Sequence, residues 1–366
     1  MKQLFSLLLM LMVLPVGSFA SGTWEAFTAD QVPEDFSFLV QEYTGTVTFT
    51  FLGDCTLGGE EKNRTSRLSF DSRIAAEGPE YPFRYLTALT EGDDWTIANL
   101  EGVLTDRELA PAEKKYNFKG PTSHTAVLTQ GSVECVNLAN NHSHDYGAAG
   151  YADTQAALEN AGIAAFGEEW LGIWRNAEGL RIGFIGVAGN LSGERAGVFG
   201  RRMEALQNLG CAAIIVIMHT GTEYDYTPDG YEKQIVNQAV EHGASLIIGG
   251  HPHVVQGVDC VGNVPVVYSL GNCVFGGNTH PRDFDALAVR AELSFEEGVL
   301  TGITLRLYPL CIASGSNNNN YSPCLLTGYD AARVLKKMER STGYQIGEFE
   351  PDRGAVLSFP IGSETK

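Results

Sequence analysis

Positive charge is scarce in this chain. Its 366 residues contain 25 lysines and arginines against 44 aspartates and glutamates, which gives a formal net charge of −19. A nucleic-acid-binding protein needs a basic face that neutralises phosphates, and docking on an anionic lipid surface needs a polybasic segment. The composition therefore argues against nucleic acid as a partner, and the acidic excess favours the solubility of an exported protein.

Long apolar runs are also lacking. A nearly continuous apolar run covers 4–16, which is shorter than the roughly 20 residues of a membrane-spanning helix. Ser18 and Ala20 follow it with the small side chains that a signal peptidase reads. We expect a signal peptide over 1–20, cleavage after Ala20, an extracellular or cell-envelope location and no stable transmembrane anchor. Retention of the segment as a weak anchor is the alternative.

Paired cysteine motifs are absent as well. The seven cysteines are scattered and include no CxxC pair, so the chain is neither a zinc ribbon nor a disulfide scaffold. Cys311 and Cys324 flank an asparagine run at 317–320. In an oxidising compartment they could close that loop as a disulfide, and free thiols are the alternative.

What the chain does have is a series of strand-like runs that end in polar residues. Strands are predicted over 46–52, 94–100, 133–139, 212–218, 244–248 and 264–269, with helices over 148–161 and 230–242. Alternating strands and helices predict an α/β fold with parallel pairing. Open α/β sheets carry their chemistry beyond the carboxyl ends of the strands, which is where the polar residues lie.

The organisation outside these strands is simpler. Residues 21–45 are predicted to be a linker, and 46–310 the main domain. Residues 311–366 are predicted to form a C-terminal extension that packs on the same domain. A hairpin over 287–308 with a turn at Glu296, Glu297 and Gly298 precedes it.

Two motifs hold adjacent candidate ligands. His251 and His253 flank a proline that stiffens the turn after a strand, so both imidazoles can face one metal site. Solvent-exposed loop histidines are the alternative. Asn141 can offer a carboxamide oxygen to a divalent cation, and His142 beside it can act as a general acid. An Asx turn that caps the next helix would explain the same residues.

Three further candidates each end a strand. His219 reads equally as a satisfied histidine at the edge of a core, and Asp54 and Glu101 read equally as turn or cap residues. Taken with the other histidines and the asparagine, they form a mixed nitrogen and oxygen set. Such a set suits one or two Mn, Fe or Zn ions better than Ca or Mg.

The order of these motifs resembles one family. The series is Gly53-Asp54, Asn99-Leu100-Glu101, Asn140-Asn141-His142, His219 with Glu223-Tyr224, Gly250-His251-Pro252-His253 and Ser269-Leu270-Gly271-Asn272. It is similar to CapA-type bacterial capsule (poly-γ-glutamate) synthesis proteins, which resemble calcineurin-like metallophosphoesterases. The resemblance implies a calcineurin-like four-layer α/β/β/α sandwich.

The resemblance also implies roles for individual residues. It implies one metal ion held by Asp54 and His253, and a second held by Asn141, His219 and His251. Glu101 would bridge the two ions, and His142 would donate a proton to the leaving group. Substrate-binding roles are expected for Lys119, Glu223, Tyr224 and Asn272, although surface charge alone would explain a lysine.

The function implied is a secreted phosphoesterase-like protein that hydrolyses or binds an anionic small-molecule or polymer substrate of the envelope. The alternatives are a noncatalytic accessory factor that works with capsule-synthesis machinery and a noncatalytic metal-binding module. One departure bears on catalysis. Calcineurin-like enzymes typically carry Asp-x-His in the first motif, whereas Cys55 and Thr56 follow Asp54 here. Cys55 could compensate as a thiolate or point into the core.

Overall fold

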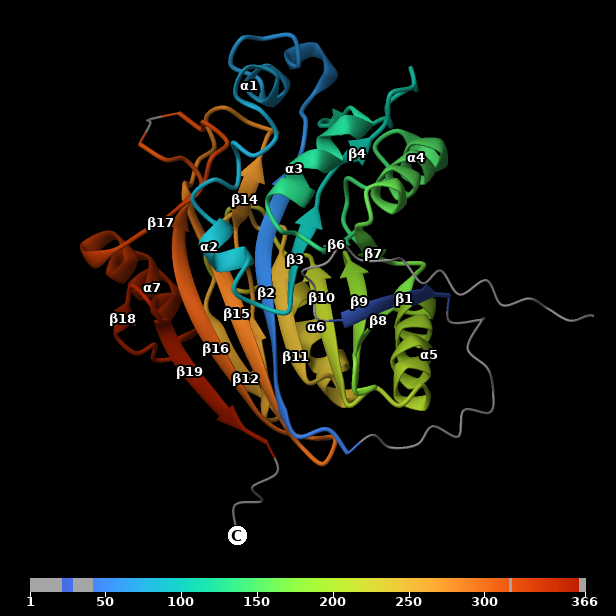
Figure 1. Cartoon of the computed structure of the whole chain (residues 1–366), viewed down its shortest axis with the longest axis vertical. Coiled ribbons are helices and arrows are strands. Elements are labelled where there is room, and N and C mark those ends of the chain that lie inside the picture. Colours follow the sequence, from blue (N-terminus) through green and yellow to red (C-terminus); the bar gives the residue numbers. More distant parts are fainter. Residues whose placement is uncertain (1–21, 29–41, 316–317, 362–366) are drawn as a thin grey trace, which may run out of the picture.

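Two β-sheets pack face to face, and helices cover their outer faces (Figure 1). This computed structural model describes residues 22–28, 42–315 and 318–361. The layers are those of the four-layer α/β/β/α sandwich, so the expected fold class is confirmed. The predicted signal peptide and residues 29–41 of the predicted linker lie outside the described residues.

The first sheet has seven strands in the order β1-β8-β9-β10-β11-β13-β12. Their bounds are Gly22–Phe27, Leu171–Asn176, Arg181–Ala188, Ala213–His219, Leu246–Gly250, Val264–Val267 and Val258–Val261, respectively. Strands β9, β10, β11 and β13 run parallel. Helices α5 (Glu194–Asn208) and α6 (Gly230–Glu241) pack on the outer face of this sheet.

The second sheet has the order β18-β19-β16-β15-β2-β3-β6-β7. These strands are Phe349–Glu350, Gly354–Pro360, Val299–Cys311, Asp285–Glu296, Gly45–Thr56, Trp95–Leu100, Cys135–Asn137 and Ala164–Phe166. Strand β14 (Asn272–Phe275) joins β2, and β17 (Cys324–Leu325) joins β16. Strands β2, β3, β6 and β7 run parallel.

Shorter elements complete the fold. Helices on or near the outer face of the second sheet are α1 (Phe70–Glu77), α2 (Thr87–Thr90), α3 (Thr125–Gln130) and α4 (Gly147–Asn160). Helix α7 (Gly328–Thr342) contributes Val334, Leu335 and Met338 to the core between the sheets. Strands β4 (Val103–Leu104) and β5 (Lys119–Gly120) form a separate pair.

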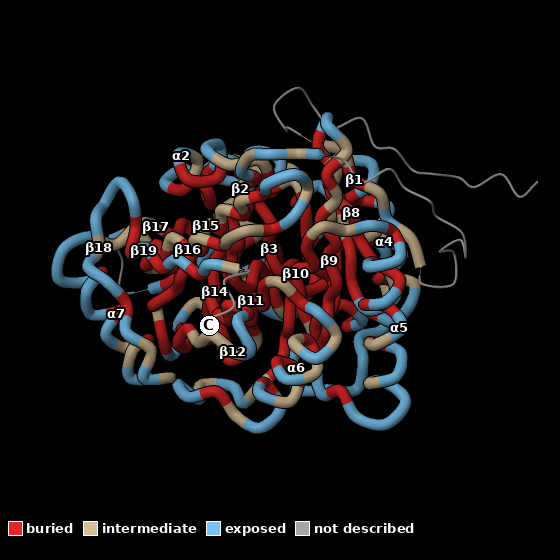
Figure 2. The backbone as a smooth tube through the Cα atoms, turned by 90° about the horizontal axis from the view of Figure 1, so that it is seen from below, coloured by how far each residue is buried: buried red, intermediate tan, exposed pale blue. Residues whose placement is uncertain are grey.

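The central strands are buried on both faces, which is why they read as continuous apolar runs. In β10, Ile215 and Ile217 point into the core between the sheets, while Ile214 and Val216 point toward the outer helices. Burying each such side chain contributes about 1.5–3 kcal/mol. Figure 2 shows the buried strands in the interior and exposed helices at the periphery.

The linker expectation is wrong for its first residues. Gly22–Phe27 pairs antiparallel with β8, and Trp24 is only 2% exposed, stacked on Trp95 between the sheets. A single buried tryptophan packs this strand against the core. An alternation over six residues is too short to stand out in the sequence. The predicted boundary at 310 falls inside β16, and β19 pairs with β16, so the C-terminal residues extend the same sheet.

The two cysteines that flank the asparagine run are direct cross-strand partners. Cys311 in β16 pairs with Cys324 in β17, and both thiols are free in the structure. The expected disulfide therefore stays a prediction, which the mass difference between reduced and unreduced protein would decide. Within the described residues, no helix combines the length and the apolarity that crossing a membrane takes.

Candidate metal centre

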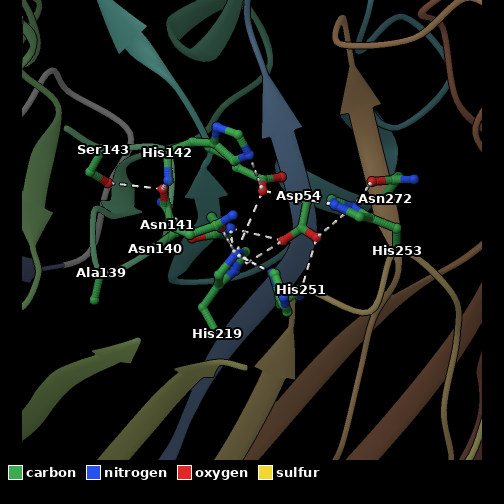
Figure 3. Close-up of polar contacts among 12 residues, drawn as sticks. Asp54, Ala139, Asn140, Asn141, His142, Ser143, His219, His251, His253 and Asn272 are labelled. Atoms are coloured by element: carbon green, nitrogen blue, oxygen red, sulfur yellow. Dashed lines mark hydrogen bonds and ion pairs between the residues drawn. The ribbon is translucent and has the colours of Figure 1, made fainter. Parts of the chain in front are cut away.

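The polar strand ends from both sheets meet at one site (Figure 3). Asp54 lies in β2, Glu101 directly follows β3, His219 ends β10, and Asn272 begins β14. Loops after β6 and β11 supply Asn141, His142, His251 and His253. The carboxyl ends of parallel strands in two packed sheets thus face one another, as the repeated sequence pattern predicts.

Glycines allow the strands that carry these side chains to approach closely. A Cβ at Gly53 would lie 2.0 Å from the carbonyl oxygen of Gly271, and one at Gly250 would lie 2.9 Å from Asp54 Oδ1. Side chains at these two positions would push β2 away from β14 and β11. The spacing of the candidate ligands therefore depends on glycine beside them.

One cluster of donors, which we call the nitrogen-rich group, consists of Glu101, His219 and His251. Their donor atoms all lie within 4.8 Å of one another. His219 Nε2 is 3.2 Å from His251 Nδ1 and 3.6 Å from Glu101 Oε1. Asn141 Oδ1 lies 2.8 Å from His219 Nε2, so an amide oxygen completes a set of four donors.

A second cluster, the oxygen-rich group, consists of Asp54, Glu101 and His253. His253 Nδ1 lies 3.4 Å from Asp54 Oδ2, and His253 Nε2 lies 4.0 Å from Glu101 Oε1. Asn272 Oδ1 is 2.9 Å from His253 Nδ1, which positions this imidazole. The two groups share Glu101, so one carboxylate stands between two potential cation sites.

Glu101 is the clearest sign of a missing positive charge. It is fully buried, and among the described residues neither of its carboxylate oxygens has a hydrogen-bond partner. A buried carboxylate without hydrogen bonds costs several kcal/mol unless positive charge compensates it. The carboxylate, amide and imidazole donors around it fit one or two divalent ions. The described chain therefore contains residue groups that could hold metal.

The pKa values of Glu101, His253 and His251 are shifted by burial and by the charged groups around them. Burial raises the pKa of Glu101, but the imidazoles of His253, His219 and His142 outweigh it and the net pKa is lowered. Burial also opposes charge on His253, yet the carboxylates of Glu101 and Asp54 raise its pKa to about 10. Burial, followed by repulsion from His219, lowers the pKa of His251 to about 4. His251 is therefore neutral, the form that binds metal.

Backbone strain is concentrated at this site. Tyr224, His251 and His253 have φ values of 63°, 95° and 55°, in the left-handed region that non-glycine residues rarely adopt. Tyr224 N also donates a hydrogen bond to the carbonyl oxygen of Pro252, which ties the two loops together. Strained residues that surrounding contacts hold in place are typical of functional sites.

His142 is fixed beside the cluster by a buried carboxylate. Its Nδ1 lies 2.7 Å from Asp145 Oδ2, and its Nε2 faces Glu101 Oε1 at 3.9 Å. Asp145 also accepts a hydrogen bond from the backbone of Phe118 and forms an ion pair with Lys114. These contacts fix the imidazole ring with Nε2 toward the centre. The sequence analysis assigns no role to Asp145, although it belongs to the same motif as His142.

Asn99 is a second residue to which the sequence analysis assigns no role. Its Nδ2 donates to Asp54 Oδ1 at 2.8 Å and lies 3.1 Å from His219 Nδ1, so it orients one residue from each group. Its Oδ1 accepts hydrogen bonds from Asn137 and Asn140. An asparagine next to a candidate ligand, inside a buried strand, is the signal that could have revealed it.

A cleft of about 790 Å³ opens above the cluster, and its lining includes His142 and His253. Glu223 and Tyr224 line this cleft, as expected for substrate-binding residues, whereas Asn272 lies beneath it beside His253. Lys119 does not line it. Its side chain is 4% exposed and its ammonium binds Glu61 Oε1 at 3.1 Å, so it stabilises the fold beside the cleft.

The first motif departs from Asp-x-His in a way that the structure makes concrete. Cys55 is fully buried in the core between the second sheet and its helices, and its thiol contacts that of Cys273. It therefore points away from the metal donors and does not compensate as a ligand. Thr56 is buried, and its hydroxyl has no hydrogen-bond partner among the described residues.

The layers of the fold and the position of its donor cluster are those of the calcineurin-like metallophosphoesterase fold. Residues 48–277 match the family model described as "Bacterial capsule synthesis protein PGA_cap". The chain belongs to that family, and the CapA-type resemblance of its motifs is confirmed.

Individual relatives agree with this family. The chain is 28% identical to "Capsule biosynthesis protein CapA" of Bacillus anthracis over 263 residues, covering 65% of this chain and 62% of that protein. It is 27% identical to "PGA biosynthesis protein CapA" of Bacillus subtilis over 266 residues, covering 67% and 68%. A "Probable polyglutamine synthesis accessory protein" of Mycobacterium tuberculosis is 26% identical over 211 residues, covering 50% and 55%. The match thus spans less than two thirds of the Bacillus anthracis protein.

Proposed function

We propose that this protein is a metal-dependent phosphoesterase that hydrolyses an anionic substrate of the cell envelope. The observation that carries the proposal is the buried carboxylate of Glu101, which has no hydrogen-bond partner in the described chain and is shared by two groups of potential ligands. A pair of cations bridged by a carboxylate is the arrangement on which many phosphoesterases depend. The open cleft above it gives a substrate access.

The metal-binding residues divide between two ions in this proposal. Asp54 and His253 would hold the first, and His219, His251 and Asn141 would hold the second. Glu101, which belongs to both groups, would serve both ions. Mn, Fe and Zn are the ions that best suit this mixture of donors. When bound, they supply Lewis acidity toward the phosphoryl oxygens and an activated water molecule.

His142 is the proton donor to the leaving group. It lines the cleft and turns Nε2 toward the centre, while Asp145 holds its Nδ1. A carboxylate on one imidazole nitrogen fixes the tautomer and stabilises the protonated ring, so the other nitrogen can deliver a proton. Asp145 is a positioning residue in this scheme because it contacts His142 and lies below the cleft lining.

Export to the envelope is part of the proposal. The expected cleavage after Ala20 leaves the whole of β1 in the mature chain, since this strand begins at Gly22. Trp24 could therefore still enter the core after processing. The capsule-related relatives support an envelope substrate.

The decisive experiment is reconstitution. Purified protein is stripped of metal, reloaded with Mn, Fe or Zn, and assayed with 4-nitrophenyl phosphate and bis(4-nitrophenyl) phosphate. We expect turnover that depends on the added ion and disappears in Glu101→Gln. A folded, metal-loaded protein that cleaves neither ester would overturn the hydrolase proposal.

The second candidate is a noncatalytic accessory role in poly-γ-glutamate capsule synthesis or export. The names of the relatives favour it, since they describe capsule and PGA biosynthesis and an accessory protein without naming hydrolysis. It predicts retention of poly-γ-glutamate in co-sedimentation, with or without bound metal. The phosphoesterase proposal instead predicts that metal removal abolishes function.

A further inference from the structure

Three basic side chains in or beside the cleft are already neutralised. Arg64, which lines the cleft, pairs with Asp71, and Lys114 and Lys119 beside it pair with Asp145 and Glu61. Each of these cations has a fixed partner in the folded protein, so an incoming anion would have to compete with that partner. These residues therefore contribute little to substrate binding.

Two basic side chains at the cleft differ from these three. In the described part of the chain, neither Lys115 nor Arg282 forms an ion pair with a carboxylate. Each lies over a tyrosine ring instead. Lys115 Nζ is 4.7 Å from the ring centroid of Tyr116, and the Arg282 guanidinium is 4.6 Å from that of Tyr224. The rings restrain the cations, and the N–H donors remain available to an anion.

The two cation–tyrosine pairs belong to one cleft although they come from different loops. All four residues line the cavity whose lining also includes His142 and His253. The pKa of Lys115 is raised, first by its contact with Tyr116 and also by Glu223, while Arg282 works against the rise. Lys115 and Arg282 thus line the same cleft as the candidate proton donor and a candidate metal ligand.

Glu223 sets the charge at this position. It lines the same cleft and is exposed beside the two cations, so the three side chains together carry one net positive charge. Glu60, Arg64 and Asp71 also line the cleft, but each of them is engaged in an ion pair. Glu223 opposes an arriving anion, and Lys115 and Arg282 attract it.

We propose that Lys115 and Arg282 form an anion clamp that binds a second negatively charged group of the substrate while its phosphoryl group lies at the metal centre. The inference rests on the proposed function and narrows the substrate to phosphoesters that carry a further carboxylate or phosphate. Tyr116 and Tyr224 position the two cations. The clamp makes Lys115 and Arg282 determinants of specificity, outside the machinery of bond cleavage.

The test compares two acetylated peptides, each with one phosphotyrosine, flanked by glutamates in one and by glutamines in the other. We expect metal-loaded protein to prefer the glutamate peptide by about tenfold in kcat/KM, which corresponds to two modest charge contacts. The double variant Lys115→Ala with Arg282→Ala should lose this preference and retain kcat/KM on the glutamine peptide. Glu223→Gln should shift the preference in the opposite direction.

Arg84→Ala is the matched control, because Arg84 also lies over tyrosine rings, 4.1 Å from Tyr81 and 4.7 Å from Tyr85, but does not line the cleft. An unchanged preference in the double variant, or an equal loss on both peptides, would overturn the clamp. The phosphoesterase proposal fails separately, on the 4-nitrophenyl esters alone. If the wild type cleaves neither peptide, calorimetric binding of the glutamate peptide decides the clamp, which requires that the double variant bind it more weakly.

Discussion

The nitrogen-rich and oxygen-rich groups share Glu101 but offer different surroundings to a cation. The first adds two imidazoles and the Asn141 amide, whereas the second adds one imidazole and the carboxylate of Asp54. Imidazole suits Zn and Fe, and carboxylates suit Mn and Mg. We expect a tighter cation site in the nitrogen-rich group and a more labile one in the oxygen-rich group, because Thr56 stands where the first motif typically has a histidine.

Removing the shared residue should have the largest effect. Glu101→Gln keeps the shape of the side chain but withdraws the only carboxylate common to both groups. We expect loss of metal from both sites and a fall in kcat/KM of about 10⁴-fold or more on 4-nitrophenyl phosphate. Elemental analysis and circular dichroism on the same sample separate metal loss from unfolding. Full metal content in the variant would show that the groups do not depend on one another through Glu101.

The next experiment tests the difference between the groups. His251→Ala and His253→Ala each remove one imidazole, from the nitrogen-rich and the oxygen-rich group respectively. We expect His251→Ala to weaken binding of the tighter ion and to lower kcat/KM by about 10³-fold, since catalysis would need that ion in place. His253→Ala should mainly affect the ion that dialysis removes first. The ranking of the sites is reversed if His253→Ala strips the ion that wild-type protein retains longest.

A smaller effect is expected where neither group is touched. His142→Ala should lower kcat by about 10²-fold, a typical contribution of a general acid, while metal content stays at the wild-type level. The loss of kcat should be smaller on an ester with an activated leaving group, such as 4-nitrophenol, than on an alkyl ester, because 4-nitrophenolate departs without a proton. Equal losses on both esters would remove the proton-donor role and leave His142 as a structural neighbour of Glu101.

The smallest of these effects belongs to the residue behind His142. Asp145→Asn keeps an acceptor for His142 Nδ1 but withdraws the charge that Lys114 also contacts. We expect kcat to fall by about tenfold, because the neutral amide orients the imidazole less firmly. The loss should be larger for an alkyl ester than for 4-nitrophenyl phosphate. Lys114→Met is the companion variant for the other side of the pair. Equal losses on both esters would indicate that Asp145 acts only in folding.

Much of the fold follows from the sequence because the central strands must be buried on both sides. The run that becomes β10 has no polar residue until His219, and a strand of that kind needs sheet or helix on each face. Strand β9 escapes notice because Gly183 and Gly186 weaken its strand signal. A Cβ at Gly186 would lie 2.3 Å from Asn137 Oδ1, so close packing of the sheets overrides local propensity there.

The site is predictable in part for a related reason. Asp54, Glu101 and the three histidines follow apolar runs, and strand ends in a parallel sheet point to one edge. The supporting contacts are harder to predict, because they depend on side-chain directions. Lys119 is expected to bind substrate, yet its ammonium pairs with Glu61 and the residue does not line the cleft. Asn99 lies in the buried strand β3, and its side chain contacts His219 only because the second sheet packs on the first.

The pairing of β2 with β15 has a consequence for how the chain reaches its folded state. Thr46 and Ser294, which contact each other across this pair, are 248 residues apart. The partner of β1 is β8, which comes much later in the sequence, and the partner of β16 is β19, which lies near the end of the described chain. Because closing such long loops precedes any gain from the contacts they make, we expect slow folding and little stable structure in a partly synthesised chain. A polypeptide of this topology would stay unfolded while it passes through a translocation channel, and it would fold once its last strands have emerged on the far side.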